Sequence, residues 1–398
     1  MSKLKELIDK FCPNGVEYQK LDDILDYEQP TQYIVKSTEY DDSYNTPVLT
    51  AGQTFILGYT NEEDGIYKAD KDSPTIIFDD FTTSFHWVDF DFKVKSSAMK
   101  MLRPKSTFEG SFKYVFYAME CIHFEAVNHT RHWISKYSQF EIPLPHPEVQ
   151  EEIVKILDRF AELQAELQAE LQARQEQYEY YRNKLLTFNE IGGGIQGVIW
   201  MKMSEIGTFI RGKRFVRTDI VNDGVPCIHY GDMYTYYGLY ATESKGMLRN
   251  ELAPKMRYAQ KNDVVIVAAG ENKEDIGIGM AWLGDEPAAV HDACFIFKSD
   301  LYPQYVSHYL RTKYYHKQIV KHVSEGKICS ISAKGLGNAI IPIPPYEEQV
   351  RIATQLNKFD ALVSDLVQGL PAEIAAVQKQ YEYYRDKLLS FPEYKLSA

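Results

Sequence analysis

Two stretches of this sequence are nearly the same: YEYYRNKLLTF at residues 178–188 and YEYYRDKLLSF at residues 381–391. Nine of the eleven positions are identical, at an offset of 203 residues. Upstream, Ile-Pro-Leu-Pro at 142–145 matches Ile-Pro-Ile-Pro at 341–344, at an offset of 199. Matches of this length indicate an internal duplication, so the fold is expected to contain one helical unit twice.

The duplication divides the 398 residues into four parts and a linker. A chain of this length is too long for one ordinary hydrophobic core, so at least two domains are expected. The two globular regions resemble each other only faintly, which indicates that they do different jobs while the helical segments do one job twice. The predicted parts are a globular region 1–141, a helical segment 142–191, a Gly-rich linker 192–200, a second globular region 201–340 and a second helical segment 341–398.

Both helical segments carry an apolar seam. From Ile352 to Leu388 the apolar residues recur every three or four positions, as in a coiled coil, and a break is expected at Gly369-Leu370-Pro371. Residues 161–172 are three identical copies of Ala-Glu-Leu-Gln, a tract of high helix propensity. We predict that the two helices pair antiparallel and place the globular regions at opposite ends of a rod roughly 60 Å long. The alternative is pairing between chains, but duplication within one chain favours the intramolecular pair.

The globular regions show a pattern of many short strands with a few helices. Strands are expected at Thr75–Phe78, His86–Phe92, Val264–Val267 and Cys294–Phe297, and helices at Phe112–Ile122 and Pro303–Val323. The predicted fold class is therefore α+β, with two mainly β, α+β domains separated by two long antiparallel coiled-coil helices.

Charge is distributed unevenly along the chain. The net charge of −12 argues against nucleic-acid binding by the chain as a whole. Residues 93–113, 211–217 and 311–334 are nevertheless basic, with aromatic and polar residues between the cations, which suits phosphate contact and base readout. A solvated charged face is the alternative for each stretch. Because salt confines the field to about 10 Å or less, an acidic body can carry a DNA-binding face. The candidate DNA contacts are Lys93, Lys95, Lys105, Arg131, Arg211, Lys213, Arg214, Arg217, Lys327, Ser330, Ser332 and Lys334.

Three motifs resemble catalytic or nucleotide-binding signatures, but each lacks a required residue or a required structural element. Residues 207–214 approach a phosphate-binding loop, but Arg214 stands where Ser or Thr should hold magnesium. Residues 275–279 are glycine-rich without a clear following helix. Ile343-Pro344-Pro345-Tyr346 resembles an adenine-methyltransferase motif with Ile343 in place of Asn or Asp. His129, Arg131 and His132 have no Cys or carboxylate at ligand spacing, so we expect neither a metal site nor a cofactor in this chain.

The remaining features indicate a cytoplasmic protein. Five scattered cysteines form no CxxC pair, so neither a zinc site nor a disulfide framework is expected. The chain has no run of 18 apolar residues, and its first 11 residues lack the apolar core of a signal peptide.

The whole plan resembles the specificity subunits of type I restriction–modification systems. The resemblance rests on the repeated Ile-Pro-x-Pro and Gln-Tyr-Glu-Tyr-Tyr-Arg-x-Lys-Leu-Leu-x-Phe segments, and it extends to residues 12–18, 209–215 and 369–374. It implies a non-catalytic chain whose two target-recognition domains, 1–141 and 201–340, each read one half of a bipartite site in double-stranded DNA. It further implies two modification subunits that use S-adenosylmethionine to methylate adenine, and motor-nuclease subunits that use ATP and magnesium.

In this family the helical segments also dock the modification subunits. The candidates for helix pairing or subunit docking are Leu163, Leu167, Leu171, Tyr178, Tyr181, Phe188, Leu366, Tyr381, Tyr384 and Phe391. The first alternative function is that of a stand-alone methyltransferase, which would need a cofactor-binding motif that this sequence lacks. The second is a structural coiled-coil adaptor, which would not explain basic, aromatic-rich globular regions. A gel-shift assay with and without a methyltransferase partner separates the three.

The Ala-Glu-Leu-Gln tract predicts that the length of the first helix sets the distance between the two globular regions and so acts as a molecular ruler for the gap between the DNA half-sites. Phe160 to Tyr178 spans 18 residues, whereas Phe359 to Tyr381 spans 22, so the first helix is one tetrapeptide shorter. One tetrapeptide adds about 6 Å of helix, equivalent to one or two base pairs of about 3.4 Å. A spacer whose length is immaterial is the alternative.

Overall fold

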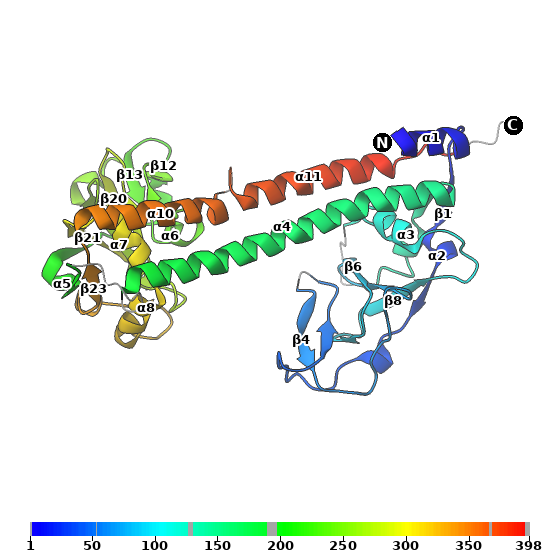
Figure 1. Ribbon diagram of the computed structural model, residues 1–398, viewed down its shortest axis with the longest axis horizontal. Helices are drawn as coiled ribbons and strands as arrows, with labels where there is room; N and C mark the ends of the chain where they lie inside the picture. Colours follow the sequence, from blue (N-terminus) through cyan, green and yellow to red (C-terminus); the bar gives the residue numbers. More distant parts are fainter. Residues whose placement is uncertain (1, 53, 126–129, 189–196, 366–367, 395–398) are drawn as a thin grey trace. The chain divides into compact units, whose positions relative to one another are not determined.

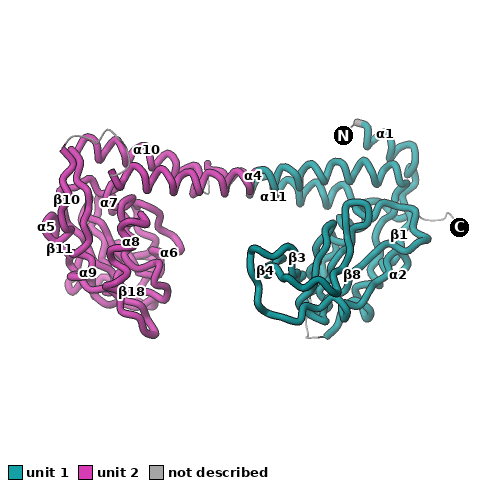
Figure 2. The backbone as a smooth tube through the Cα atoms, turned by 60° about the horizontal axis from the view of Figure 1, so that its bottom comes forward, with its two compact units in different colours: residues 1–166, 375–398 teal, residues 167–374 magenta. Residues whose placement is uncertain are grey.

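Figure 1 shows the computed structural model of the chain, which describes residues 2–52, 54–125, 130–188, 197–365 and 368–394. It contains two compact units, coloured separately in Figure 2: unit 1 is Met1–Glu166 with Ala375–Ala398, and unit 2 is Leu167–Ile374. Each unit combines a globular head with parts of the helical segments, and the predicted domain boundaries stay a prediction. Gly192–Gly194, His129 and Leu366 lie outside the described residues.

The head of unit 1 is built from small sheets against short helices. Helix α3 (Phe112–Met119) begins where Ser111 Oγ accepts the backbone N–H of Tyr114 at 3.3 Å. The core of this head includes Phe78, from the strand Thr75–Asp79, together with Tyr114 and Trp133, and the Phe78 ring packs against the Trp133 ring. In the four-stranded sheet the strand order is β2 (Leu25–Glu28), β8 (Met99–Pro104), β5 (Thr75–Asp79), β6 (Phe85–Val88). In the three-stranded sheet it is β4 (Ile56–Thr60), β3 (Thr46–Leu49), β7 (Lys93–Val94). A two-stranded sheet pairs β1 (Glu17–Lys20) with β9 (Glu141–Leu144). Helices α1 (Ser2–Phe11) and α2 (Leu21–Ile24) complete the head.

The head of unit 2 contains two five-stranded sheets. The strand Val264–Val267 is buried at all four positions and lies at the centre of the first sheet, as its continuous apolar run predicts. The sheet orders are β11 (Gly207–Arg211), β21 (Cys294–Ser299), β17 (Val264–Val267), β19 (Gly279–Trp282), β14 (Tyr240–Ala241), and β12 (Ile220–Val221), β15 (Gly246–Leu248), β13 (Val225–Ile228), β20 (Ala288–Val290), β16 (Tyr258–Ala259). Two further two-stranded sheets pair β10 (Ile199–Lys202) with β23 (Ile340–Ile343) and β18 (Ala269–Gly270) with β22 (Cys329–Ser330). The helices of this head are α5 (Met203–Ile206), α6 (Asp232–Thr235), α7 (Pro303–Tyr309), α8 (Lys313–Ile319) and α9 (Ala333–Gly337).

The duplication extends into the junction between each head and its helix. The Pro-containing residues 142–144 belong to β9, which pairs with β1, and residues 341–343 belong to β23, which pairs with β10. Gln150 and Gln349 are buried, and each accepts a backbone N–H of the head at 2.8 and 2.9 Å. Each also donates to a proline carbonyl, at 2.7 and 2.9 Å. The same two hydrogen bonds of a buried glutamine therefore hold the helix to the head at both junctions.

Three long helices carry the repeated segments. Helix α4 (Pro147–Thr187) is continuous over 41 residues, whereas the second segment forms α10 (Tyr346–Ser364) and α11 (Leu370–Leu388). The break predicted at Gly369-Leu370-Pro371 is confirmed. In unit 1, Phe160 of α4 stacks on Tyr384 of α11 at 5.7 Å and Gln164 bonds to Gln378, so these two helices run antiparallel. The sheets, helices and long α4 confirm the α+β class.

Other expected elements differ in extent. The single helix expected over Pro303–Val323 is wrong: it divides into α7 and α8. Thr312 causes the division, because its hydroxyl accepts the N–H of Tyr315 at 3.2 Å and starts a new helix there. The strand expected at His86–Phe92 ends at Val88.

Candidate nucleic-acid interface

A cleft of about 860 Å³ in the head of unit 2 gathers four of the predicted DNA contacts. Arg211 ends β11, Arg214 and Arg217 follow it along the chain, and the fourth, Lys327, lies in the loop before β22. Lys327 is more than a hundred residues from the other three in sequence, so only the tertiary fold brings them together. The lining cations are Arg211, Arg214, Arg217 and Lys327.

The loop after β11 is held against the strand ends behind it. The N–H of Gly212 donates to the carbonyl of Cys294 at 3.0 Å, and the N–H of Lys213 donates to that of Val290 at 2.9 Å. A Cβ at Gly212 would lie 2.2 Å from the carbonyl oxygen of His291, so only glycine permits this approach. Arg211 Nε donates to the carbonyl of Asp292 at 2.9 Å. These contacts fix the backbone at the start of the loop, and the loop then carries the exposed side chains of Lys213 and Arg214.

The cations of this loop differ in how far they are neutralised. Arg217 Nη1 lies 3.1 Å from Asp232 Oδ1, and Lys245 shares the same carboxylate. Lys213, Arg214 and Lys327 are exposed, and within the described ranges none of them forms an ion pair. Their charges are therefore available to a phosphate, whereas Arg217 chiefly holds Asp232.

Aromatic and imidazole rings line the same cleft. Phe215 and His291 have ring centroids 5.1 Å apart, and His229 lies 4.7 Å from both Tyr230 and His291. Burial lowers the pKa of His229 to about 4 and also lowers the pKa of His291. The Nδ1 atoms of these histidines accept backbone N–H groups at 3.2 and 3.1 Å. Both rings are therefore neutral at pH 7 with the proton on Nε2. Nε2 of His229 can donate to an acceptor such as a base edge or a phosphate oxygen, whereas the ring of His291 already hydrogen-bonds the backbone of Phe215.

Sequence reasoning missed His229, Tyr230, His291 and Phe215. Their signal in the sequence is weak, since His229, Tyr230 and His291 come just after short apolar strands and resemble core residues, while Phe215 is a single aromatic residue beside the basic residues of the loop. The fold places them beside the basic loop.

The remaining candidates of the second head lie near Lys327. Ser330 and Lys334 are exposed. Ser332 caps α9, because its hydroxyl accepts the N–H of Gly335 at 3.2 Å. Its hydroxyl thus already has a structural partner.

In the first head the expectation for Lys93 is corrected. Its side chain is 1% exposed, lies 3.1 Å from Glu62 and donates to the carbonyl of Asp64 at 2.6 Å. A phosphate cannot reach an ammonium held inside the head. Successive strand residues point to opposite faces, and the basic run at 93–113 includes two strands. Lys95 is half-buried beside the Tyr40 ring, Lys105 donates to the carbonyl of Asp22, and Arg131 is exposed.

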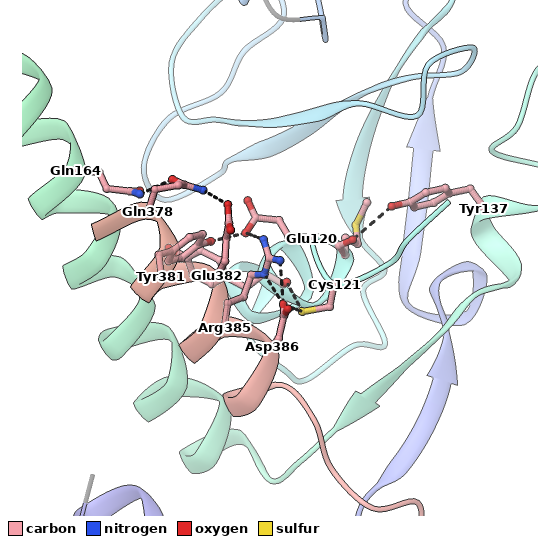
Figure 3. Close-up of polar contacts among 11 residues, drawn as sticks. Glu120, Cys121, Tyr137, Gln164, Gln378, Tyr381, Glu382, Arg385 and Asp386 are labelled. Atoms are coloured by element: carbon pink, nitrogen blue, oxygen red, sulfur yellow. Dashed lines mark hydrogen bonds and ion pairs between the residues drawn. The ribbon is translucent and has the colours of Figure 1, made fainter. Parts of the chain in front are cut away.

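The tyrosines of the repeated segments pack their helices onto the heads. Figure 3 shows Tyr381 and Arg385 of α11 pointing toward Glu120 at the end of α3. Tyr381 donates a hydrogen bond to Glu120, and Arg385 Nη1 lies 3.7 Å from the same carboxylate. In unit 2, Tyr178 Oη lies 3.3 Å from His308 Nδ1. Both tyrosines are therefore core residues.

The other helix candidates range from buried to exposed. Leu167 and Phe391 are buried, and Leu171 and Phe188 pack partly against the core of unit 2. Leu163 and Tyr181 are 40% and 37% exposed. Among the described residues, no helix is long and apolar enough to cross a membrane, and no group of three or more His, Cys, Asp or Glu is placed to hold a metal ion.

Comparison with known proteins covers most of the chain. The family described as "Type I restriction modification DNA specificity domain" matches residues 13–176 and 198–376. The type I restriction enzyme EcoR124I/EcoR124II specificity subunit of Escherichia coli is 40% identical over 99% of this chain and 98% of its own. A putative specificity subunit of Haemophilus influenzae, S.HindORF215P, is 30% identical over 94% and 96%. The S subunit of a type I system from M. genitalium shares the fold with a TM-score of 0.56, at 15% identity over 94% of this chain and 96% of that chain.

Proposed function

Since the chain belongs to the family of type I restriction–modification specificity subunits, which are DNA-recognition components, we propose that its two heads each read one half of a bipartite site in double-stranded DNA. The observation that carries this proposal is the cleft of unit 2. It combines unpaired cations for phosphates with a neutral imidazole donor and aromatic rings. In the first head we propose Lys95, Lys105 and Arg131 as contacts. Ser330, Ser332 and Lys334 continue the proposed surface of the second head beyond Lys327.

The chain is proposed to act without a cofactor of its own and without catalysing a reaction, because its nearest approaches to nucleotide-binding and methyltransferase motifs each lack a required residue or structural element. Two modification subunits would supply methyl transfer with S-adenosylmethionine, and motor-nuclease subunits would supply cleavage with ATP and magnesium. The cytoplasm is the proposed location, as for other proteins that act on cellular DNA.

The helices are proposed to dock the modification subunits and to set the distance between the half-sites. Helix α4 supports the second role, because its first 20 residues belong to unit 1 and the rest belongs to unit 2 without a break. Any change in its length is therefore transmitted from one unit to the other.

The test of DNA reading is the salt dependence of binding. We expect Lys213→Ala with Arg214→Ala to weaken DNA binding and to lower the slope of log K against log salt by up to about 2, since each lost phosphate contact removes about 0.9. The matched control is Lys255→Ala with Lys261→Ala, which removes two exposed lysines of the same head that lie outside the basic stretches and do not line the cleft. An unchanged slope in the first variant would exclude this loop from the interface.

A further inference from the structure

The cleft of unit 2 exposes two aliphatic side chains among its cations. Ile328 is 60% exposed and Val216 is 46% exposed, and both line the cleft together with Arg214 and Lys327. A single exposed aliphatic residue is ordinary on a protein surface. Two of them, carried into one cation-lined cleft by separate loops, indicate that the ligand of this cleft has an apolar feature as well as negative charges.

Ile328 lies in a loop whose two ends are held by the fold. Ser324 and Ser330 bridge the ends of the loop, each donating its backbone N–H to the carbonyl of the other, at 2.8 and 3.0 Å. Glu325 forms an ion pair with Lys273, and β22, which follows Ile328 directly, pairs with β18. The position of Ile328 at the cleft is therefore set by these contacts, and its exposure is a property of the folded head.

The other groups of the cleft are polar, and each suits a polar feature of DNA. The unpaired cations suit phosphates, Nε2 of His229 suits an acceptor, and the carboxylate of Glu271, which also lines the cleft, suits an amino group of a base. In the major groove the C5-methyl group of thymine is the apolar feature of a base-pair edge, and apolar side chains contact it. Ile328 therefore matches a feature of the DNA that the polar groups of the cleft cannot recognise.

We propose that Ile328 contacts the C5-methyl group of a thymine and thereby selects thymine at one position of the half-site read by the second head. This rests on the proposed function, since it assumes that DNA occupies the cleft. The contact is favourable because it removes apolar surface of both groups from water. It neutralises no phosphate, so its loss should leave the salt dependence of binding unchanged, unlike the loss of Lys213 and Arg214.

The test uses the full chain in complex with its modification subunit and short DNA duplexes that carry the site identified by sequencing of methylated DNA. Each thymine of the site is replaced in turn by deoxyuridine, which lacks only the methyl group. The wild-type complex should lose affinity roughly four-fold at one thymine, as expected for one buried methyl group. The Ile328→Ala complex should bind the thymine and deoxyuridine duplexes equally at that position, with the salt slope of the wild type.

Two control variants test whether the effect belongs to the side chain at this position. Ile328→Val keeps a branched aliphatic side chain and should keep the preference for thymine. Ile199→Ala makes the same truncation at another exposed isoleucine of unit 2, one that does not line the cleft, and should leave the four-fold difference unchanged.

The outcomes separate the proposal from its premise. A wild-type complex that does not bind the site would contradict the proposed function itself. A wild-type complex that binds the site but distinguishes thymine from deoxyuridine at no position overturns the methyl contact. An Ile328→Ala complex that is weakened on every duplex yet still distinguishes the two bases points to a wedge between base pairs and also overturns it. Loss of the distinction in Val216→Ala but not in Ile328→Ala overturns the assignment to Ile328.

Discussion

Adding a fourth Ala-Glu-Leu-Gln copy after Gln172 should lengthen the unread gap between the two DNA half-sites. The tract 161–172 lies inside the unbroken helix α4, so the insertion extends the helix instead of forming a loop. Four residues add about 6 Å and turn the following part by about 40° beyond a full turn. At about 3.4 Å per base pair, the gap should grow by one or two base pairs, and by less if the helix is tilted.

The structure indicates why the fold should tolerate this change. Leu167 is buried and Leu171 is half-buried, and the new copy supplies a leucine at the same spacing. The second helical segment is not one continuous helix either, because α10 ends at Ser364 and α11 begins at Leu370, so it can accommodate the extension where one helix gives way to the next.

The assay is expression with the modification subunit followed by sequencing of methylated sites. Both half-sites should stay the same while the gap lengthens. The matched control is Glu162→Gln, Glu166→Gln and Glu170→Gln together, which changes three exposed side chains of the tract but not its length. Full methylation with the original gap in the insertion variant would refute the ruler.

Three further predictions concern the separate parts of the chain. Exchanging residues 1–141 for those of a relative should change one half-site only, as read by methylation sequencing; a change in both half-sites would contradict two independent readers. The purified chain with S-adenosylmethionine and DNA should transfer no methyl group until a modification subunit is added, and transfer by the chain alone would contradict a non-catalytic role. Burial lowers the pKa of His308 to about 3, below its unfolded value of about 6.5, so its contribution to stability is complete above pH 6.5 and is lost as pH falls toward 3. His308 should therefore contribute about 1.4 kcal/mol per pH unit to the loss of the free energy of unfolding over this window, beside the contribution of the other buried histidines such as His229. Chemical denaturation of the full chain should show that His308→Asn lowers the slope of this free energy against pH by about that amount, and an equal slope in the variant would exclude His308 as a source.

The sequence by itself determined the duplication, the helical segments and the α+β class. These follow from local patterns: identical segments at a fixed offset, an apolar residue every three or four positions, and Gly-Leu-Pro where the second helix breaks. The family resemblance followed from the same segments. Each of these features is visible in the order and spacing of residues along the chain, without knowledge of which segments meet in space.

Only the tertiary structure decided which residues form the candidate interface. Lys93 and Lys213 both lie in basic stretches, yet Lys93 is buried against Glu62 and Lys213 is exposed, because Lys93 belongs to strand β7 and points into the head whereas Lys213 lies in the loop after β11. Arg214 and Lys327 meet in one cleft because the fold brings β11 and the loop before β22 to the same place. The stacking of Phe160 on Tyr384 likewise joins the first copy of the repeat to the second, a long-range pairing that no local pattern of residues contains.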